Sequence, residues 1–506
     1  MKMKRLLSLL LALLLAVVLP LAALAEESDG VTPGDPPSGE MSSPDGTPPG
    51  DPPDGAAGGP GGTPPGDPPD GGKGGTPPGD PPDGGTGGPG GFGGGTPPGG
   101  GTSSFEYSAA NEITSAAELA DVAYATDTAD ESALIINTAD AVVITNPGVA
   151  KTGDSNGGDN CNFYGLNAAV LVMGGSETTI TGGVITSDAS GANGVFCYGG
   201  NGGRNGASGD GTTVIISDTV ITTTGDGSGG IMTTGGGTTY ASNLTVETSG
   251  RSSAAIRTDR GGGTVVVDGG TYTSNGLGSP AIYSTADITV KNAELVSNLS
   301  EGVCIEGMNS ITLENCSLTA NNTSMNGHAT FLDTIMIYQS MSGDADSGTS
   351  AFTMTGGSLT SLSGHMFHVT NTHAVITLSG VELVNQGSDV LLSVCDDGWN
   401  GASNQAELVA DNQVLYGTIL VGGNSELTLT LVNGSSLTGC ISGEIENADG
   451  AVVSTQTGTV AVSLDSTSTW TLTADTYITS FEGDAGSVTG NGYTLYVNGA
   501  ALEGIN

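Results

Sequence analysis

One cluster of basic side chains stands out as a group that could do chemistry. Arg257 and Arg260 flank Asp259 and follow Arg251, in a chain with only 10 Lys and Arg residues. A positioned basic group beside an acid can move protons at a reacting atom, so Arg257, Asp259 and Arg260 are the candidate catalytic residues. The alternative is a surface ion pair that fixes a corner, worth about 0–1 kcal/mol. Arg257 follows the apolar Ile256 and would face outward on a strand, and we favour the ion pair.

Four aspartates offer oxygen ligands to a hard cation. Asp344 and Asp346 stand two residues apart in a segment rich in Gly and Ser, and Asp396 and Asp397 are adjacent. Carboxylate oxygens are preferred ligands of calcium, so Ca²⁺ is the cofactor that these positions suggest. The full ligand set of a calcium loop is missing, and we favour solvated loops.

Three of the four histidines, His365, His368 and His373, lie close together in the sequence. On a strand, successive side chains alternate between faces, so His365 and His368 are predicted to point in opposite directions. The sequence therefore does not predict a metal ion shared between them.

A few aromatic residues fall in segments that interrupt the regular pattern of the chain. Tyr164, Tyr198, Tyr338 and Trp399 are the candidate ligand-binding residues, and Phe163 accompanies Tyr164. Flat rings with a polar edge suit sugar faces and protein partners alike. The alternative is that these rings wedge the interrupting segments onto the rest of the fold.

The elements that would position these groups must be built from an unusual composition. The chain has 506 residues, 87 of them Gly, and a formal net charge of −43. Such a charge disfavours binding to nucleic acid or to anionic membranes.

The first 102 residues read as an export signal and a spacer. Lys2, Lys4 and Arg5 precede an apolar run. Ala23-Leu24-Ala25 follows as an A-x-A cleavage site, and together these features predict a signal peptide over residues 1–25. A membrane anchor is the alternative, and after removal of the signal we expect no membrane insertion. Residues 26–102 are low in complexity and rich in Pro, Gly and Asp, which predicts a disordered, extended linker.

Residues 103–506 carry an internal repeat. A unit with two apolar positions, a Gly, Asn or Asp and a third apolar position recurs every 21–26 residues, or every 32–41 residues where a segment is inserted. The second apolar position of each unit, the anchor, is occupied in turn by Leu119, Ile144, Ile180, Ile216, Ala241, Val267, Val290, Leu313, Met354, Leu378, Ala410, Leu431 and Leu472.

Two further apolar columns keep a fixed offset from the anchors. Five residues after them lie Val149, Ile185, Ile221, Val246, Tyr272, Leu295, Leu318, Leu359, Leu383 and Leu415. Fifteen residues after them lie Val195, Ile231, Ile256, Ile282, Ile305 and Val369. Three inward columns per turn predict an all-β fold: a single right-handed parallel β-helix of about 13 turns, with Gly, Asn and Asp at corners that need positive φ. A β-sandwich would show hairpins and no constant offsets.

Six cysteines are spread sparsely through this repeat. We favour small buried core residues for them. If a disulfide forms, Cys161 and Cys197 are the pair that would fix a long insertion.

The repeat resembles the right-handed β-helix superfamily that includes pectin and pectate lyases, polygalacturonases and bacterial adhesins. Residues 470–480, from Trp470 to Ser480, resemble a late turn of pertactin-like passengers, and Thr179 to Gly183 resembles strands of calcium-dependent carbohydrate-binding β-helices. The resemblance implies polysaccharide chemistry or binding. Polygalacturonases carry a G-H-G and an R-I-K motif that this chain lacks, so Asp396-Asp397 is not expected to be their acid pair. A lyase would use Ca²⁺ and a basic residue, for which Arg257 and Arg260 are the candidates.

The sequence as a whole favours a binding protein over an enzyme. We expect a secreted or cell-surface protein, with wall association as one option, whose partner is a polysaccharide or a surface protein. A polysaccharide lyase or glycoside hydrolase and a purely structural surface protein are the alternatives. The oligomeric state is left open.

Overall fold

The computed structural model describes residues 106–202, 208–399 and 404–506. They belong to the second of two compact units, Asp83–Asn506. The predicted signal peptide, residues 1–25, and the predicted linker, residues 26–102, lie outside the described residues. Within the described ranges, no helix combines the length and the apolar character needed to cross a membrane.

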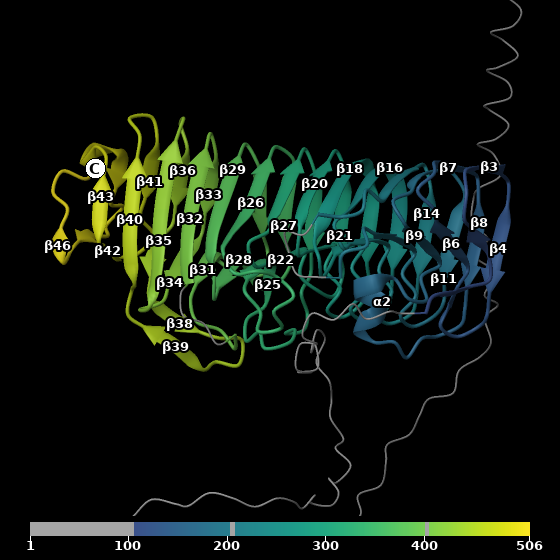
Figure 1. Ribbon diagram of the computed structural model, residues 1–506. Coiled ribbons are helices and arrows are strands. Elements are labelled where there is room, and N and C mark those ends of the chain that lie inside the picture. Colours follow the sequence, from purple (N-terminus) through teal and green to yellow (C-terminus); the bar gives the residue numbers. More distant parts are fainter. Residues whose placement is uncertain (1–105, 203–207, 400–403) are drawn as a thin grey trace, which may run out of the picture. The chain divides into compact units, whose positions relative to one another are not determined.

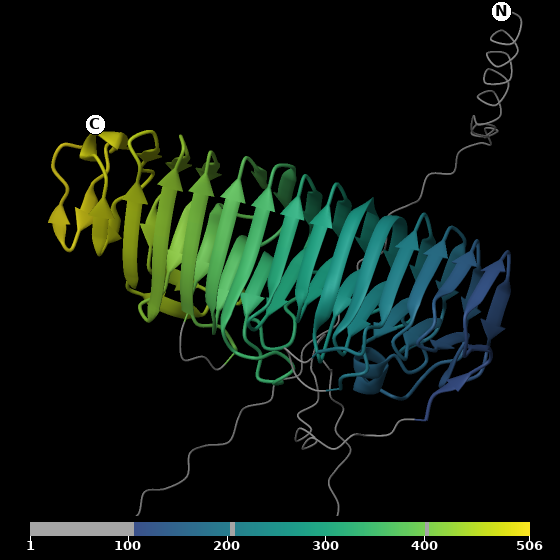
Figure 2. The ribbon, with the colours of Figure 1, turned by 45° about the horizontal axis from the view of Figure 1, so that its top comes forward.

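The described chain winds as a parallel β-helix, as the sequence predicted (Figure 1). One turn consists of β20 (Asp287–Lys291), β21 (Glu294–Ser297) and β22 (Val303–Glu306). The next turn begins with β23 (Ser310–Glu314), which pairs with β20 in parallel. In the turns up to residue 385, the first two strands of a turn join one sheet and the third strand joins another; in the later turns, the second strand belongs to a separate four-stranded sheet. Figure 2 shows the parallel strands lying side by side in turn order.

Two sheets contain most of the strands. The long sheet has 22 strands: β3 (Ala117–Ala120), β4 (Ala123–Thr126), β7 (Val142–Thr145), β8 (Gly148–Lys151), β10 (Glu177–Thr181), β11 (Val184–Ser187), β13 (Thr213–Ser217), β14 (Val220–Thr223), β16 (Gly237–Thr248), β18 (Gly263–Ser274), β20, β21, β23, β24 (Ser317–Ala320), β26 (Thr349–Thr355), β27 (Ser358–Ser361), β29 (His373–Ser379), β30 (Glu382–Asn385), β32 (Asn404–Asp411), β35 (Ser425–Val432), β40 (Thr459–Leu464) and β43 (Ser480–Glu482).

The side sheet has 13 strands, one for each of the roughly 13 predicted turns: β2 (Glu112–Ile113), β6 (Leu134–Asn137), β9 (Val170–Met173), β12 (Val195–Tyr198), β15 (Ile231–Thr234), β17 (Ile256–Thr258), β19 (Ile282–Ser284), β22, β25 (Asp333–Tyr338), β28 (His365–Thr370), β31 (Val390–Val394), β34 (Thr418–Val421) and β37 (Ile441–Ser442).

The other elements are short. They are α2 (Asp159–Tyr164), the 3-10 helix η1 (Ala485–Ser487), β1 (Ser108–Ala109), β5 (Glu131–Ser132), β33 (Val414–Tyr416), β36 (Ser436–Thr438), β38 (Glu444–Glu446), β39 (Val452–Thr455), β41 (Thr469–Thr471), β42 (Thr476–Ile478), β44 (Val488–Thr489), β45 (Leu495–Val497) and β46 (Ala500–Ala501). Among them, β33, β36, β41 and β44 form the separate sheet of the later turns.

The predicted anchors form one continuous ladder inside the coil. Each anchor from Leu119 to Leu431 is the direct strand partner of the next. The last anchor is wrong, because Leu431 pairs with Leu464 and not with Leu472. The hairpin β38–β39, inserted before that turn, disturbs the spacing from which Leu472 was chosen.

The third column is displaced by two residues part-way along the coil. Ile282 pairs with Val303, whereas Ile305 pairs with Ser284 and, on the next turn, with Ile337. A shift of two residues leaves a side chain on the same face of a strand. Ile305 and Val369 therefore still lie in the core, as predicted, but in a neighbouring column.

The corners follow one rule along the coil. Asn292, two residues after its anchor, has a φ of 53°, a left-handed conformation that costs most side chains about 1–2 kcal/mol and that Gly, Asn and Asp accept. In the other turns from β3 to β35, the same position carries positive φ at Asp121, Asn146, Gly182, Asp218, Asn243, Gly269, Asn315, Gly356, Gly380, Asn412 and Asn433.

The outer faces of the two sheets differ. The outer face of the side sheet is covered by inserted segments, including α2 and the β38–β39 hairpin (Figure 1). Beneath them lie small apolar clusters outside the coil, such as Leu171 with Phe196 and Leu420 with Ile445. The outer face of the long sheet exposes several apolar side chains, Tyr240 among them.

The cysteines are free, so the disulfide between Cys161 and Cys197 is not present. Cys197 and Cys316 belong to the main core, as the favoured interpretation predicted.

Candidate functional site

The predicted catalytic cluster lies beneath the cover of the side sheet. Ile256 points into the core, so alternation along β17 directs Arg257 to the outer face, as predicted. Arg257 is nevertheless only 5% exposed and Asp259 is fully buried. Arg257 Nη2 lies 2.8 Å from Asp259 Oδ2, and its Nη1 donates to the carbonyl of Ser252 over 3.0 Å. The pair is therefore a buried ion pair and not a surface one.

Burial shifts the pKa of the acid in this pair. Burial raises the pKa of Asp259 to about 7, while the adjacent Arg257 acts in the opposite direction. The guanidinium carbon of Arg257 also lies 5.4 Å from the ring centroid of Tyr283, a cation–π distance. These contacts hold Arg257 in place without leaving it open to a substrate.

Arg260 joins a predicted catalytic residue to a predicted metal ligand. Its Nη2 and Nε lie 2.5 and 3.1 Å from Asp344 Oδ1. Its guanidinium carbon lies 4.1 Å from the ring centroid of Phe163 in α2. Arg260 thus ties α2, the corner after β17 and the insertion before β26 together, and it neutralises the carboxylate of Asp344.

The four predicted ligand-binding aromatics fall into two pairs. Tyr338 and Trp399 are 6% and 8% exposed, with ring centroids 4.9 Å apart, and they pack with Met336 and Cys304 on the side sheet. This is the wedging role of the alternative interpretation. Tyr164 and Tyr198 are half-buried, and their rings meet edge to face at 5.9 Å.

Glu306 is a buried hub that the sequence analysis missed. Its Oε2 accepts hydrogen bonds from Tyr283 Oη at 2.5 Å and from Tyr338 Oη at 3.3 Å. Its Oε1 accepts from Ser342 Oγ at 3.2 Å and also from Ser340 Oγ. Burial raises the pKa of Glu306, and the bonds from Ser340 and Tyr283 oppose that rise. The sequence did contain a signal for this residue, because Glu306 is an acidic residue at an outward position of a strand whose other residues are apolar.

A second buried chain of hydrogen bonds links Ser393, His368 and Asp397. His368 Nδ1 lies 2.7 Å from Ser393 Oγ, and His368 Nε2 lies 3.3 Å from Asp397 Oδ2. Asp397 Oδ1 accepts from the backbone N–H and the hydroxyl of Thr330 at 2.6 and 2.7 Å. Although burial alone would raise it, bonds from His368 and Thr330 hold the pKa of Asp397 below its ordinary value.

These residue types match those of acyl-transfer enzymes, but the arrangement does not. Ser393 and His368 are fully buried, so the hydroxyl is not open to a substrate. A second histidine, His365, also bonds to Ser393 Oγ, at 2.8 Å. The chain of bonds instead fastens two insertions to the side sheet.

The prediction that His365 and His368 point to opposite faces is wrong. Both Met366 and Phe367 enter the core, which breaks the alternation within β28. Burial, with a contribution from His368, lowers the pKa of His365 to about 3, so this imidazole is neutral at physiological pH.

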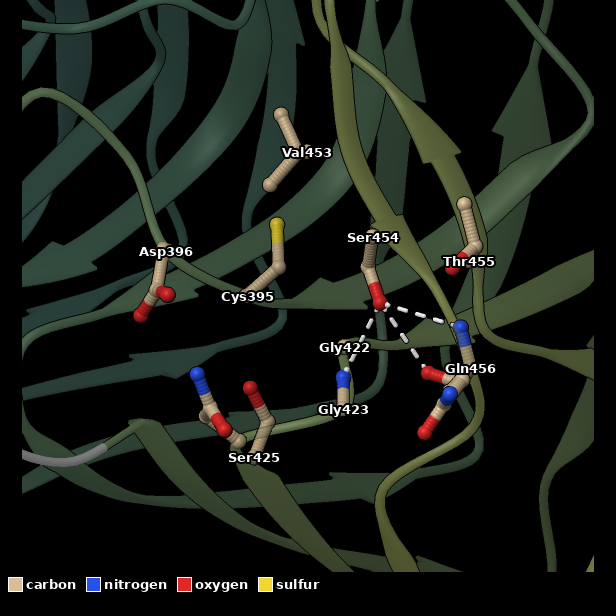
Figure 3. A pocket seen from close by; sticks show the side chains of 10 residues that line it. Cys395, Asp396, Gly422, Gly423, Ser425, Val453, Ser454, Thr455 and Gln456 are labelled. Atoms are coloured by element: carbon tan, nitrogen blue, oxygen red, sulfur yellow. Dashed lines mark hydrogen bonds between the residues drawn. The ribbon is translucent and has the colours of Figure 1, made fainter.

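The remaining predicted aspartates are not gathered into one site. Asp346 lies near Asp344, and its carbonyl accepts from the Met308 N–H at 2.8 Å. Asp396 is exposed, accepts from Asn404 Nδ2 at 2.7 Å and borders a cavity of about 150 Å³ (Figure 3). That cavity is otherwise lined by Cys395 and residues 422–425 and 453–456. Within the described ranges, no three His, Cys, Asp or Glu residues are placed to hold a metal ion together.

The outer face of the long sheet carries aligned hydroxyl side chains. Thr289, Thr312, Thr353 and Thr377 are successive strand partners on β20, β23, β26 and β29, and each is half-buried. Thr319 and Thr360 form a parallel column on β24 and β27. We call these six residues the threonine face. Strands in a sheet lie about 4.8 Å apart, so the hydroxyl and methyl groups repeat at that interval.

No protein-family model, curated protein or solved structure matches this chain. The parallel β-helix is therefore established by the structure alone. The resemblance to the pectin-lyase-like superfamily and to pertactin-like passengers remains an expectation from the sequence.

Proposed function

We propose that this chain is a secreted or cell-surface β-helix of the carbohydrate-binding, adhesin-like branch, which binds a neutral polysaccharide along the threonine face. The observation that carries the proposal is the register of Thr289, Thr312, Thr353 and Thr377. Each threonine offers a hydroxyl that donates and accepts hydrogen bonds and a methyl group for apolar contact. A periodic row of such groups suits an extended polymer with a periodic structure.

The net charge of the chain indicates which kind of polysaccharide it would bind. The chain has a formal net charge of −43, which repels polyuronates and other polyanions. Carboxylates also stand beside the threonine face, because Asp287 and Glu314 are outward residues of the strands that carry Thr289 and Thr312. We therefore expect the partner to be a neutral polysaccharide and not an acidic one.

The buried state of the best catalytic candidates supports binding without turnover. Arg257 and Asp259 are paired and buried, and Arg260 is bonded to Asp344. An enzyme must present its acid and base to the substrate within hydrogen-bonding reach. The proposed signal peptide, residues 1–25, and the proposed spacer, residues 26–102, would present such a binding body outside the cell and away from its wall.

Affinity electrophoresis tests the proposal. The chain lacking residues 1–25 is run through native gels cast with neutral or acidic polysaccharides, and each gel is stained for loss of polymer. We expect retardation by at least one neutral polysaccharide without depolymerisation. Thr312→Glu places a charge in the middle of the threonine face and should abolish the retardation. Thr152→Glu, at an exposed position outside that face, is the matched control and should retain it.

Three results would overturn the proposal. They are retardation by acidic polymers alone, equal retardation of both glutamate variants, and breakdown of the polymer in the gel. The last of these would indicate a lyase or hydrolase.

A further inference from the structure

Asp333 is a buried carboxylate at the start of a strand of the side sheet. It is the first residue of β25 and is 1% exposed. Neither of its carboxylate oxygens accepts a hydrogen bond from the described residues. A buried acceptor left without a partner costs about 1–3 kcal/mol, and more if it is charged. Asp333 is therefore either held at a cost or completed by something that binds there.

A second buried acid, Glu301, occupies the equivalent place on the preceding turn. Val303 pairs with Ile335, and the Gly302 N–H donates to the Thr334 carbonyl at 2.8 Å. Glu301 and Asp333 are each two residues before this pair, so they occupy equivalent positions in adjacent turns, and Glu301 acts electrostatically on Asp333. Glu301 is also 1% exposed.

The insertion after β24 brings amide groups to the two acids. Asn326 Nδ2 lies 2.7 Å from both carboxylate oxygens of Glu301. Asn326 Oδ1 is a buried oxygen that also has no hydrogen-bond partner among the described residues. Asn322 Nδ2 donates to the Asp333 carbonyl at 3.2 Å. Three buried oxygens without partners, two of Asp333 and one of Asn326, thus accompany the carboxylate of Glu301.

Three described basic residues are engaged elsewhere. Arg257, Arg260 and Lys291 form their ion pairs with Asp259, Asp344 and Glu314. Within the described ranges, neither Glu301 nor Asp333 takes part in a salt bridge. Carboxylate and amide oxygens together are the ligand chemistry of calcium, which binds through six to eight oxygens and tolerates irregular geometry.

We propose that Glu301, Asp333 and Asn326 form a binding site for one divalent cation of the calcium type. Two carboxylates and an amide oxygen make up the set, which is distinct from Asp344, Asp346, Asp396 and Asp397. A bound cation would neutralise the two buried acids and fasten the insertion that contains Asn326 to the side sheet. The site belongs to the side sheet and the threonine face to the long sheet, so this proposal does not depend on the proposed polysaccharide.

Calorimetric titration of the chelator-treated chain with CaCl₂ tests this site. We expect a single binding event for the unaltered chain and at least a tenfold loss of affinity in Asp333→Asn. Asp389→Asn is the control, because Asp389 is an exposed aspartate between β30 and β31, and the affinity of this variant for calcium should be unchanged. A rise of the melting temperature with CaCl₂ should follow the same pattern.

Glu301→Gln provides a second variant should Asp333→Asn fail to fold, and it should also weaken binding. The proposal is overturned if the unaltered chain binds no calcium. It is equally overturned if Asp333→Asn and Glu301→Gln bind calcium as tightly as the unaltered chain, or if Asp389→Asn loses binding.

Discussion

From the buried pair of Arg257 and Asp259 we predict how a substitution changes the free energy of unfolding. In Arg257→Met, the carboxyl of Asp259 would keep its fully buried position but lose the guanidinium 2.8 Å away. Removing one partner of a buried ion pair typically costs about 3–5 kcal/mol, because the other charge stays behind unpaired. We expect a loss of that size in the free energy of unfolding at pH 8.5.

The loss should depend on pH in a defined direction. Burial raises the pKa of Asp259 to about 7 even though Arg257 opposes the rise. Well below pH 7 the folded protein holds Asp259 protonated, with or without Arg257, so little ion-pair energy is lost. Above pH 7 Asp259 is charged in the unaltered chain, and the variant must bury that charge alone or bind a proton at a cost. The loss should therefore be smaller at pH 5 than at pH 8.5.

Urea denaturation followed by circular dichroism measures the effect. The double variant Arg257→Met/Asp259→Leu removes both charges and should recover most of the loss, because apolar replacement of a whole buried pair is often neutral. The reasoning is refuted if Arg257→Met unfolds at the same urea concentration as the unaltered chain at pH 8.5. It is also refuted if the double variant is no more stable than the single one.

Four further predictions concern the rest of the described body. Trp470→Ala should cost about 3–5 kcal/mol in urea denaturation, because the ring is fully buried and its Nε1 donates to the Gly439 carbonyl at 3.0 Å; Trp470→Phe should cost clearly less, and equal losses would contradict this. Asn292→Ala should lower stability by about 1–2 kcal/mol because φ is 53°, whereas Asn292→Gly should be nearly neutral; a thermal melt in which Ala matches Gly would be inconsistent with the strain. Burial raises the pKa of Cys197 to about 12, so this thiol should react with a thiol reagent only after denaturation; a disulfide in the native chain would disprove the assignment. Between pH 5 and pH 7 the raised pKa values of Asp259 and Glu306 should lower the melting temperature, whereas the lowered pKa of His365 should raise it. The melting temperature should therefore fall more steeply over this interval in His365→Gln than in the unaltered chain; an equal or shallower fall in the variant would exclude this linkage.

The regular part of the fold could be predicted residue by residue. A strand has a strict period of two, and each corner requires a residue that accepts positive φ. These two constraints fixed the anchor ladder from Leu119 to Leu431. The prediction failed at Leu472, where an inserted hairpin intervenes, because an insertion changes the count without changing the pattern.

The candidate site could not be predicted in the same way. Arg260 meets Asp344 across 84 residues, and Thr330 meets Asp397 across 67 residues. No period of the repeat determines where an insertion folds back, so the sequence could name these residues but not their partners. The threonine face could have been predicted from the sequence, because its six threonines occupy outward positions in turns that the anchors had already aligned.

The contact between Arg260 and Asp344 should affect how the β-helix unfolds under mechanical force. In a coil whose turns touch only their neighbours, a chain pulled from one end can release one turn after another. Arg260 follows β17, whereas Asp344 follows β25, so their ion pair spans several turns and also holds Phe163 of α2. Turns near the C-terminus should therefore detach in small, even steps under mechanical force. The stretch between β17 and β25 should resist until the ion pair breaks and then yield in one larger step.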